Sequence, residues 1–125
     1  MKVKTEGFYA SEPMFIEDDG HKWTANAGLW FTGGGKIYKA GARDRRVEVD
    51  DFTDQAYFGE YHFDNDKLQC VFMKNTLYRT VSIYDVISSE LLIHVKSGRR
   101  FHFIPLSESE LKQALEIFDQ KAKKS

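Results

Sequence analysis

The stretch YFGEYHFDNDKLQCVF, residues 57–72, decides the fold class of this chain. On both sides of the polar turn Asp64-Asn65-Asp66, apolar side chains alternate with polar ones. Alternation with a period of two is typical of a strand that buries one face and exposes the other. The stretch therefore predicts an antiparallel hairpin. Its buried face is expected to carry Tyr61, Phe63, Leu68, Cys70 and Phe72.

Short segments of the same kind recur along the chain up to Ile104, separated by residues typical of turns. The triplet Gly33-Gly34-Gly35 predicts a tight hairpin, because glycine tolerates the positive φ that such turns require. Residues 11–21 are polar and irregular in pattern, and we expect an irregular connection there. We count about eight strands among nine candidate segments. The segments are 7–10, 27–31, 36–39, an edge strand at Val47 and Val49, 57–63, 68–72, 78–86, 91–95 and 101–103.

A meander of this kind buries one face when the sheet curls and closes on itself. The predicted fold class is therefore mainly β, an antiparallel up-and-down meander closed into a small barrel. A chain of 125 residues is long enough to bury about two thirds of its unfolded surface around a single core. We expect one domain covering residues 1–125, with strands up to about residue 104.

A single C-terminal amphipathic helix is predicted over about residues 107–122, after Pro105 ends the last strand. Ser107 and Glu110 form a capping box, in which the hydroxyl and the carboxylate each accept an amide hydrogen bond at the helix start. The helical spacing predicts one apolar face. That face consists of Leu111, Ala114, Leu115, Phe118 and Ala122, and Leu106 is placed to contact Leu111 as a hydrophobic staple. Lysines 121, 123 and 124 complement the helix dipole and need no partner.

Composition argues against several classes of partner. The 18 basic residues nearly balance the 19 acidic ones, and the net charge is −1. Proteins that bind nucleic acid by neutralising phosphates, or that bind anionic membranes, carry a basic excess. No apolar stretch approaches the ~18 residues of a membrane span, and residues 1–6 lack the apolar core of a signal peptide. We expect no nucleic-acid partner and no membrane span, and a cytoplasmic location if Met1 is the native start.

Catalytic and metal-binding motifs are not evident. Cys70 is the only cysteine, and its place in a predicted strand indicates a buried, inert thiol rather than a nucleophile. Ser82, Ser88 and Ser89 lack the strand-to-helix context of a nucleophile elbow. Arg43, Arg45 and Arg46 form a basic group, but the neighbouring Asp44, Glu48 and Asp50 offset its charge. We therefore expect no enzyme and no cofactor.

Three histidines alternate with apolar residues in their predicted strands and therefore point to the opposite face of the sheet: His62, His94 and His102. A three-residue loop at 97–99 would set His94 opposite His102, and two such imidazoles can share a metal ion or act as a pH-dependent element. A loop of two or four residues would put them on opposite faces of the sheet. With no third ligand evident from the spacing, solvated histidines are the default interpretation.

Several short motifs resemble those of small bacterial lipocalin-like (calycin-type) domains. They are Gly7-Phe8-Tyr9, Gly28-Leu29-Trp30-Phe31 with Gly35-Lys36-Ile37, Gly59-Glu60-Tyr61-His62-Phe63 with Asp66-Lys67-Leu68, Ser89-Glu90-Leu91-Leu92, and Arg100-Phe101-His102-Phe103-Ile104-Pro105. They occur in the order that the family shows. The resemblance implies an antiparallel barrel that binds a small apolar ligand, and it transfers no specific site residue.

An eight-stranded barrel is just wide enough either to be filled by its own side chains or to hold one small ligand. Both alternatives remain open at this point. The residues expected to face inward, and to line a pocket if one exists, are Trp30, Tyr61, Phe63, Phe72, Phe101 and Phe103. Tyr61 and Tyr84 are the candidates for polar contacts with a ligand.

A pleckstrin-homology-like interaction module is the main alternative, because that fold also joins about seven strands to one C-terminal amphipathic helix. Such a module would have a filled barrel and would recognise a protein or a lipid headgroup. A helix packed on the barrel wall, with the mouth of the barrel left open, favours ligand uptake. A helix that plugs one end favours recognition of a peptide or a lipid headgroup in a groove between helix and sheet. The capping box is compatible with both placements.

Overall fold

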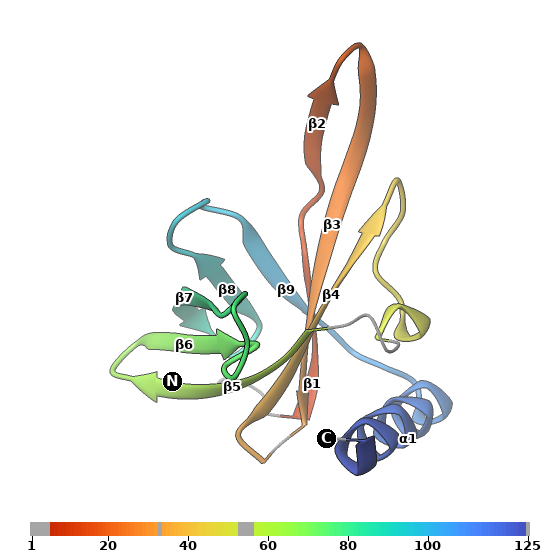
Figure 1. The fold of residues 1–125 in the computed structure, drawn as a ribbon, viewed down its shortest axis with the longest axis vertical. Coiled ribbons are helices and arrows are strands. Elements are labelled where there is room, and N and C mark those ends of the chain that lie inside the picture. The colour runs from red at the N-terminus through yellow and green to blue at the C-terminus, as the bar shows by residue number, and fades with distance from the viewer. Residues whose placement is uncertain (1–5, 33, 53–56, 125) are drawn as a thin grey trace.

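The computed structural model describes residues 6–32, 34–52 and 57–124. All of its strands pair antiparallel, and eight of them close into a barrel (Figure 1). The strands of the barrel are β1 (Glu6–Ser11), β3 (His21–Thr32), β4 (Lys36–Arg43), β5 (Tyr57–Asp64), β6 (Lys67–Phe72), β7 (Thr80–Ser88), β8 (Leu91–His94) and β9 (Arg100–Ile104). Successive strands are neighbours, and β1 closes the ring by pairing with both β3 and β9. The predicted fold class is confirmed.

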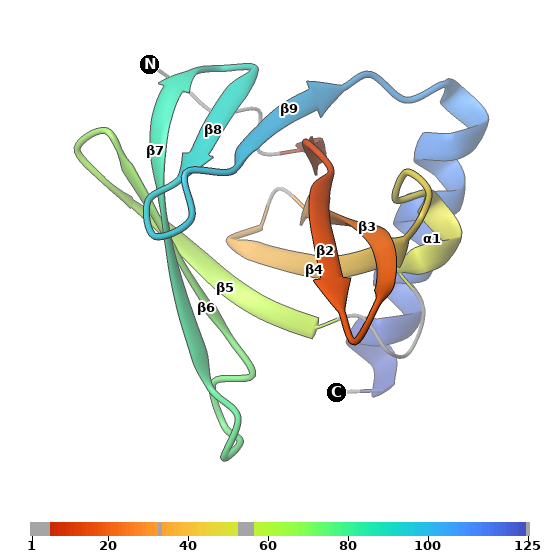
Figure 2. The same ribbon diagram turned by 90° about the horizontal axis from the view of Figure 1, so that it is seen from above.

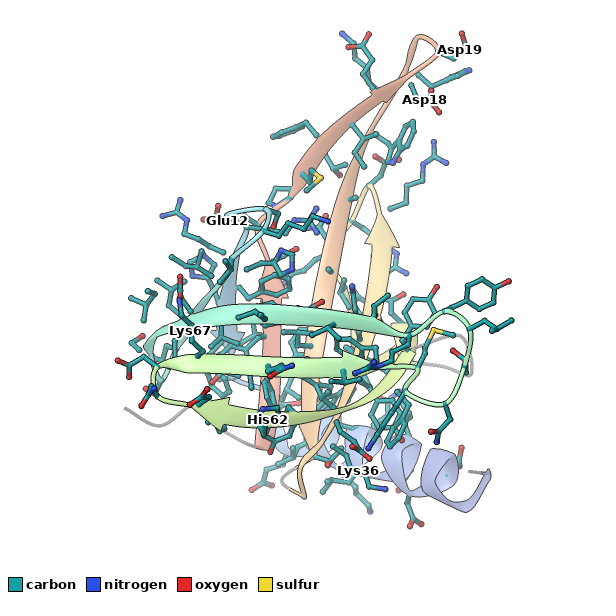
Figure 3. All side chains as sticks on the ribbon, turned by 60° about the vertical axis from the view of Figure 1, so that its left-hand side comes forward. Glu12, Asp18, Asp19, Lys36, His62 and Lys67 are labelled. Carbon is teal, nitrogen blue, oxygen red and sulfur yellow. The ribbon has the colours of Figure 1, made fainter. Side chains whose placement is uncertain are left out.

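A ninth strand, β2 (Met14–Asp18), lies outside the barrel and pairs with the first part of β3. Together they form a hairpin that projects from the barrel body, with Asp18 and Asp19 at its tip (Figure 3). Asp19 and Gly20 both have positive φ, 50° and 79°, as a two-residue hairpin turn requires. The expectation of an irregular connection at 11–21 was therefore wrong. The Asp-Gly pair was the sequence signal for this hairpin.

The predicted edge strand at Val47 and Val49 is also wrong. The chain runs there as a loop that ends in the short 3₁₀ helix η1 (Val49–Asp51). Arg45 forms two hydrogen bonds with Asp51, at 2.9 and 2.5 Å, which offset the charge of the predicted basic group. Val47 and Val49 are both buried, but against the outside of the barrel rather than in a sheet.

The buried residues form two separate cores. The inner core fills the barrel, and its members are Tyr9, Ala27, Leu29, Phe31, Ile37, Leu68, Cys70, Phe72, Tyr84, Val86, Leu92 and Phe101. The outer core lies between the barrel wall and the segments that cover it, and its members are Phe8, Ala10, Trp30, Tyr38, Ala40, Val47, Val49, Phe52 and Ala114. Alternating residues of β1, β3 and β4 belong to different cores, so this part of the wall is buried on both faces. Gly28 makes room for the covering segment, since a Cβ at that position would lie 2.9 Å from Val47.

The helix α1 (Glu108–Lys124) begins with the predicted capping box. The Glu110 amide donates to Ser107 Oγ at 3.2 Å, and the Ser107 amide donates to Glu110 Oε1 at 3.1 Å. The helix lies beside the barrel against η1 and the outer core (Figure 2). It therefore covers the barrel wall and does not plug an end of the barrel.

The face by which α1 packs differs from the predicted one. Ala114 is fully buried and Ile117 is partly buried in the outer core. Leu111 and Leu115 are 39% and 53% exposed, so the prediction that they face the core was wrong. The packing of α1 on the barrel wall, rather than the spacing of its apolar residues, decides which of these residues are buried. The side chains of Phe118, Ala122 and the three C-terminal lysines lie outside the described residues.

Candidate ligand-binding site

The aromatic residues predicted to line a pocket do not all reach the barrel interior. Phe72, Tyr84 and Phe101 belong to the inner core, and Tyr61 and Phe103 pack against it. Phe63 is 42% exposed, with its ring 5.8 Å from that of Tyr61. Trp30 faces outward into the outer core, so its predicted inward orientation was wrong. Its neighbours Leu29 and Phe31 face inward instead.

One end of the barrel interior carries polar side chains, and sequence reasoning identified only part of this group. Lys39 follows the inner-core residue Ile37 by two positions in β4, and His94 follows Leu92 by two in β8. Residues two apart in a strand point to the same side of the sheet. We call the following group the polar end: Lys39, Cys70, Ser82, Tyr84, His94 and Arg99. It lies where the loop between β8 and β9 joins the barrel.

Contacts between these residues show that they converge. The Lys39 ammonium lies 5.6 Å from the centroid of the Phe72 ring. The rings of Tyr84 and His94 lie on paired strands with centroids 5.1 Å apart. Arg99 Nη2 donates to the carbonyl of Ala25 on β3 at 3.2 Å, so the guanidinium reaches across the end of the barrel. Closure of the sheet thus brings together residues that are up to 60 positions apart.

Burial dominates the electrostatics of the polar end. Loss of hydration lowers the pKa of Lys39, and the nearby Arg99 lowers it further. Loss of hydration also lowers the pKa of His94, with smaller effects from Lys39, Arg99 and Lys96. It raises the pKa of the Cys70 thiol to about 12, so this thiol is neutral and inert, as predicted.

The cations of the polar end have no described counterion. Within residues 6–32, 34–52 and 57–124, no carboxylate pairs with Lys39 or Arg99. Arg99 Nε is buried and has no hydrogen-bond partner among the described residues. Lys39 and Arg99 are half-buried, and a cation that loses part of its hydration is stabilised by an opposite charge. This arrangement is suited to hold an anion.

The pairing of His94 with His102 that a three-residue loop would have produced does not occur. The five residues 95–99 connect β8 to β9, and the His94 amide donates to the Arg99 carbonyl at 2.8 Å. His102 lies opposite Leu91 instead, and its Nε2 is 3.2 Å from Glu12 Oε1 on the outside (Figure 3). His94 Nδ1 lies 2.7 Å from Ser97 Oγ. Among the described residues, no three His, Cys, Asp or Glu side chains are grouped to hold a metal ion.

The part of the chain that the structure describes has a cavity near η1 and another on the β2–β3 hairpin, both outside the barrel. The first, of about 500 Å³, is lined by Val47 and Asp50 near η1 and by Glu110 and Gln113 of α1. Gln113 Nε2 donates to Asp50 Oδ1 at 2.8 Å, which links the helix to η1 beside this cavity. The second, of about 440 Å³, lies on the β2–β3 hairpin between Phe15 and Trp23.

Comparison of the chain with protein-family models, curated proteins and solved structures gave no match. None of the described helical residues form a helix that is long and apolar enough to cross a membrane. The function is therefore argued from the geometry of the site.

Proposed function

We propose that this protein is a small lipocalin-like binding protein that takes one small, partly apolar molecule at the polar end of its barrel. The observation that carries this proposal is the placement of α1. Its buried residues pack on the outer core, against the wall, and not on the polar end. The helix has its structural partner there, which leaves the polar end to serve binding.

The side chains at the polar end suit a site that opens for a ligand. Most of the inner core is aromatic or branched aliphatic and fills the barrel with rigid groups. Lys39 and Arg99 are long, flexible and only half-buried. A ligand that displaces their stems would lie against the rings of Phe72 and Tyr84, with the Tyr84 hydroxyl, which is hydrogen-bonded to Ser82, as a donor. Such a mixture of aromatic surface and a few polar groups is typical of small-molecule sites.

The test is a fluorescence titration of the full chain with the neutral probe N-phenyl-1-naphthylamine. We expect saturable binding to one site per chain. Tyr84→Ala should weaken this binding, and Trp30→Phe, which changes the outer core, should leave it unchanged. Absence of saturable binding by the unmodified protein would refute the proposal. Native mass spectrometry after gentle purification gives a second readout, because a bound molecule adds its own mass.

A pleckstrin-homology-like interaction module is the second candidate, and the filled inner core favours it. In this alternative the barrel is only a scaffold, and recognition occurs on its outside. The β2–β3 hairpin then supplies the contact surface for a protein, since Phe15 is 83% exposed beside the 440 Å³ cavity. Replacing residues 14–24 with a short Gly-Ser linker would abolish partner binding in this alternative. The same change would leave probe binding intact if the ligand site lies at the polar end.

A further inference from the structure

We infer that the molecule bound at the polar end is an organic anion, and that Lys39 and Arg99 hold its carboxylate or phosphate group. This inference rests on the proposed ligand site and names the chemical class that the site selects. It is argued from the burial, the pairing and the charge of the groups at that end.

The first argument is that both cations are withdrawn from water without full compensation. A guanidinium carries five N–H donors. Among the described residues, the Arg99 guanidinium donates one hydrogen bond, to the Ala25 carbonyl, and its buried Nε has no partner. The Lys39 ammonium contacts the Phe72 ring, which offers attraction but no hydrogen-bond acceptor. An anion at this point would accept the unused donors, and hydrogen bonds between charged groups are the strong ones.

Second, two carboxylates on segments that adjoin the contacts of Arg99, those of Asp44 and Glu12, have other partners. Asp44 accepts a hydrogen bond from the Thr24 amide at 2.8 Å and lies 3.8 Å from Arg43. Glu12 binds Arg100 at 3.0 Å on the outside of the barrel. Neither neutralises the polar end. An anionic ligand would relieve the repulsion between Lys39 and Arg99, which lowers the pKa of Lys39.

The third argument is that the remaining polar groups accept an anion and repel a cation. Cys70 stays protonated at neutral pH, because burial raises its pKa to about 12. Burial likewise raises the pKa of Tyr84, so its hydroxyl remains a donor. His94 is neutral or positive. Every described side chain of the polar end is therefore neutral or cationic, and a positively charged ligand would be repelled by Lys39 and Arg99.

The experiment compares four ligands that share one decyl chain, so that the head group is the only variable. They are decanoate, decyl phosphate, decanol and decyltrimethylammonium, each titrated into the full-length protein by calorimetry. We expect the anions to bind at least ~tenfold more tightly than decanol, the factor expected for a hydrogen-bonded charge pair. Decyltrimethylammonium should not bind. The comparison of decanoate with decyl phosphate identifies the preferred anionic group.

Two variants locate the effect. Lys39→Met and Arg99→Met keep an unbranched stem and remove the charge. Each should abolish most of the difference in affinity between decanoate and decanol. Lys36→Met is the matched control, because Lys36 is on the same strand but faces outward over Phe58 (Figure 3). In the absence of ligand, Lys39→Met should raise the midpoint of thermal unfolding, since it removes a poorly hydrated charge. This measurement also shows that the variant is folded.

The outcomes separate the inference from the proposed function. If decanol binds as tightly as decanoate, the ligand site stands and the anion inference is wrong. The inference is also wrong if the anions bind well but Lys36→Met weakens their binding as much as Lys39→Met does. In that case the anions respond to the general charge of the surface and not to the polar end. If neither the decyl compounds nor the neutral probe binds, the proposed function fails and the inference fails with it.

Discussion

The indole ring of Trp30 stands edge-on to the ring of Phe52, with the centroids 4.7 Å apart and the planes at 81°. This contact joins the outer face of β3 to the segment that follows η1. Phe8 meets both rings in the same geometry, at 6.0 and 5.5 Å. The outer core is therefore an aromatic cluster that attaches η1 to the barrel wall.

Phe52→Ala is expected to lower the free energy of unfolding by about 3–5 kcal/mol, because it leaves a cavity in a fully buried aromatic cluster. The measurement is urea unfolding followed by circular dichroism. Phe15→Ala is the control, since this exposed side chain should change stability by no more than about 0.5 kcal/mol. Equal effects of the two substitutions would show that η1 does not pack as described.

The docking of α1 can be tested at Ala114. Ala114 is fully buried against the barrel wall, so Ala114→Leu should cost about 1–3 kcal/mol of unfolding free energy by overpacking. Leu115 is half-exposed on the other side of the helix, and Leu115→Ala should be nearly neutral. The same urea titration measures both. A larger loss of unfolding free energy for Leu115→Ala than for Ala114→Leu would show that the face predicted from the sequence is the one that packs on the barrel.

Cys70 is expected to be unreactive in the folded protein. The thiolate is the reactive form of cysteine, and burial raises the pKa of this thiol to about 12. At pH 8, a disulfide reagent such as dithionitrobenzoate should modify Cys70 slowly in buffer and at the free-thiol rate in urea. Because the folded pKa is raised, this thiol favours the folded state below its unfolded pKa. That contribution is lost as the pH rises toward 12. Fast modification in buffer would contradict this description of the inner core.

His94 is expected to make the protein sensitive to acid. Its folded pKa lies below the usual 6.5 because of burial first, and then because of Lys39, Arg99 and Lys96. The unfolded chain therefore binds a proton at higher pH than the folded protein does. The contribution of neutral His94 is fully present above pH 6.5 and is lost as the pH falls through the folded pKa.

Proton NMR titration should give a midpoint below 6.5 for the His94 ring. His94→Gln should reduce the loss of unfolding free energy between pH 7.5 and pH 5. Binding of decanoate should raise the midpoint, because the anion offsets the two neighbouring cations. A midpoint at or above 6.5 in the ligand-free protein would show that the ring is not surrounded as described.

Local sequence patterns predicted much of the barrel and little of the site. The hairpin at 57–72, the pairing of β3 with β4 and the capping box at Ser107 each depend on interactions between residues close in the chain, and all three are confirmed. Phe63, predicted on the buried face of the first hairpin, is exposed instead. The Asp19-Gly20 hairpin was equally local, and its turn signal was overlooked. Lys39 also gave a signal, since a charged residue two positions after Ile37 in a predicted strand has an inward position.

The sequence by itself determined that the chain alternates in short strands, that one capped helix follows them and that Cys70 is buried. Tertiary structure decided which face of each strand is inside. A period of two shows which residues share one face of a strand, but not which face is inside. Around Trp30 both faces of the barrel wall are buried, so burial alone does not tell the inner face from the outer one. The outer face is the one that η1 and α1 cover. Tertiary structure also assembled the polar end. Lys39, His94 and Arg99 meet because β1 closes the sheet on β3 and β9, and no local pattern encodes a contact across that distance.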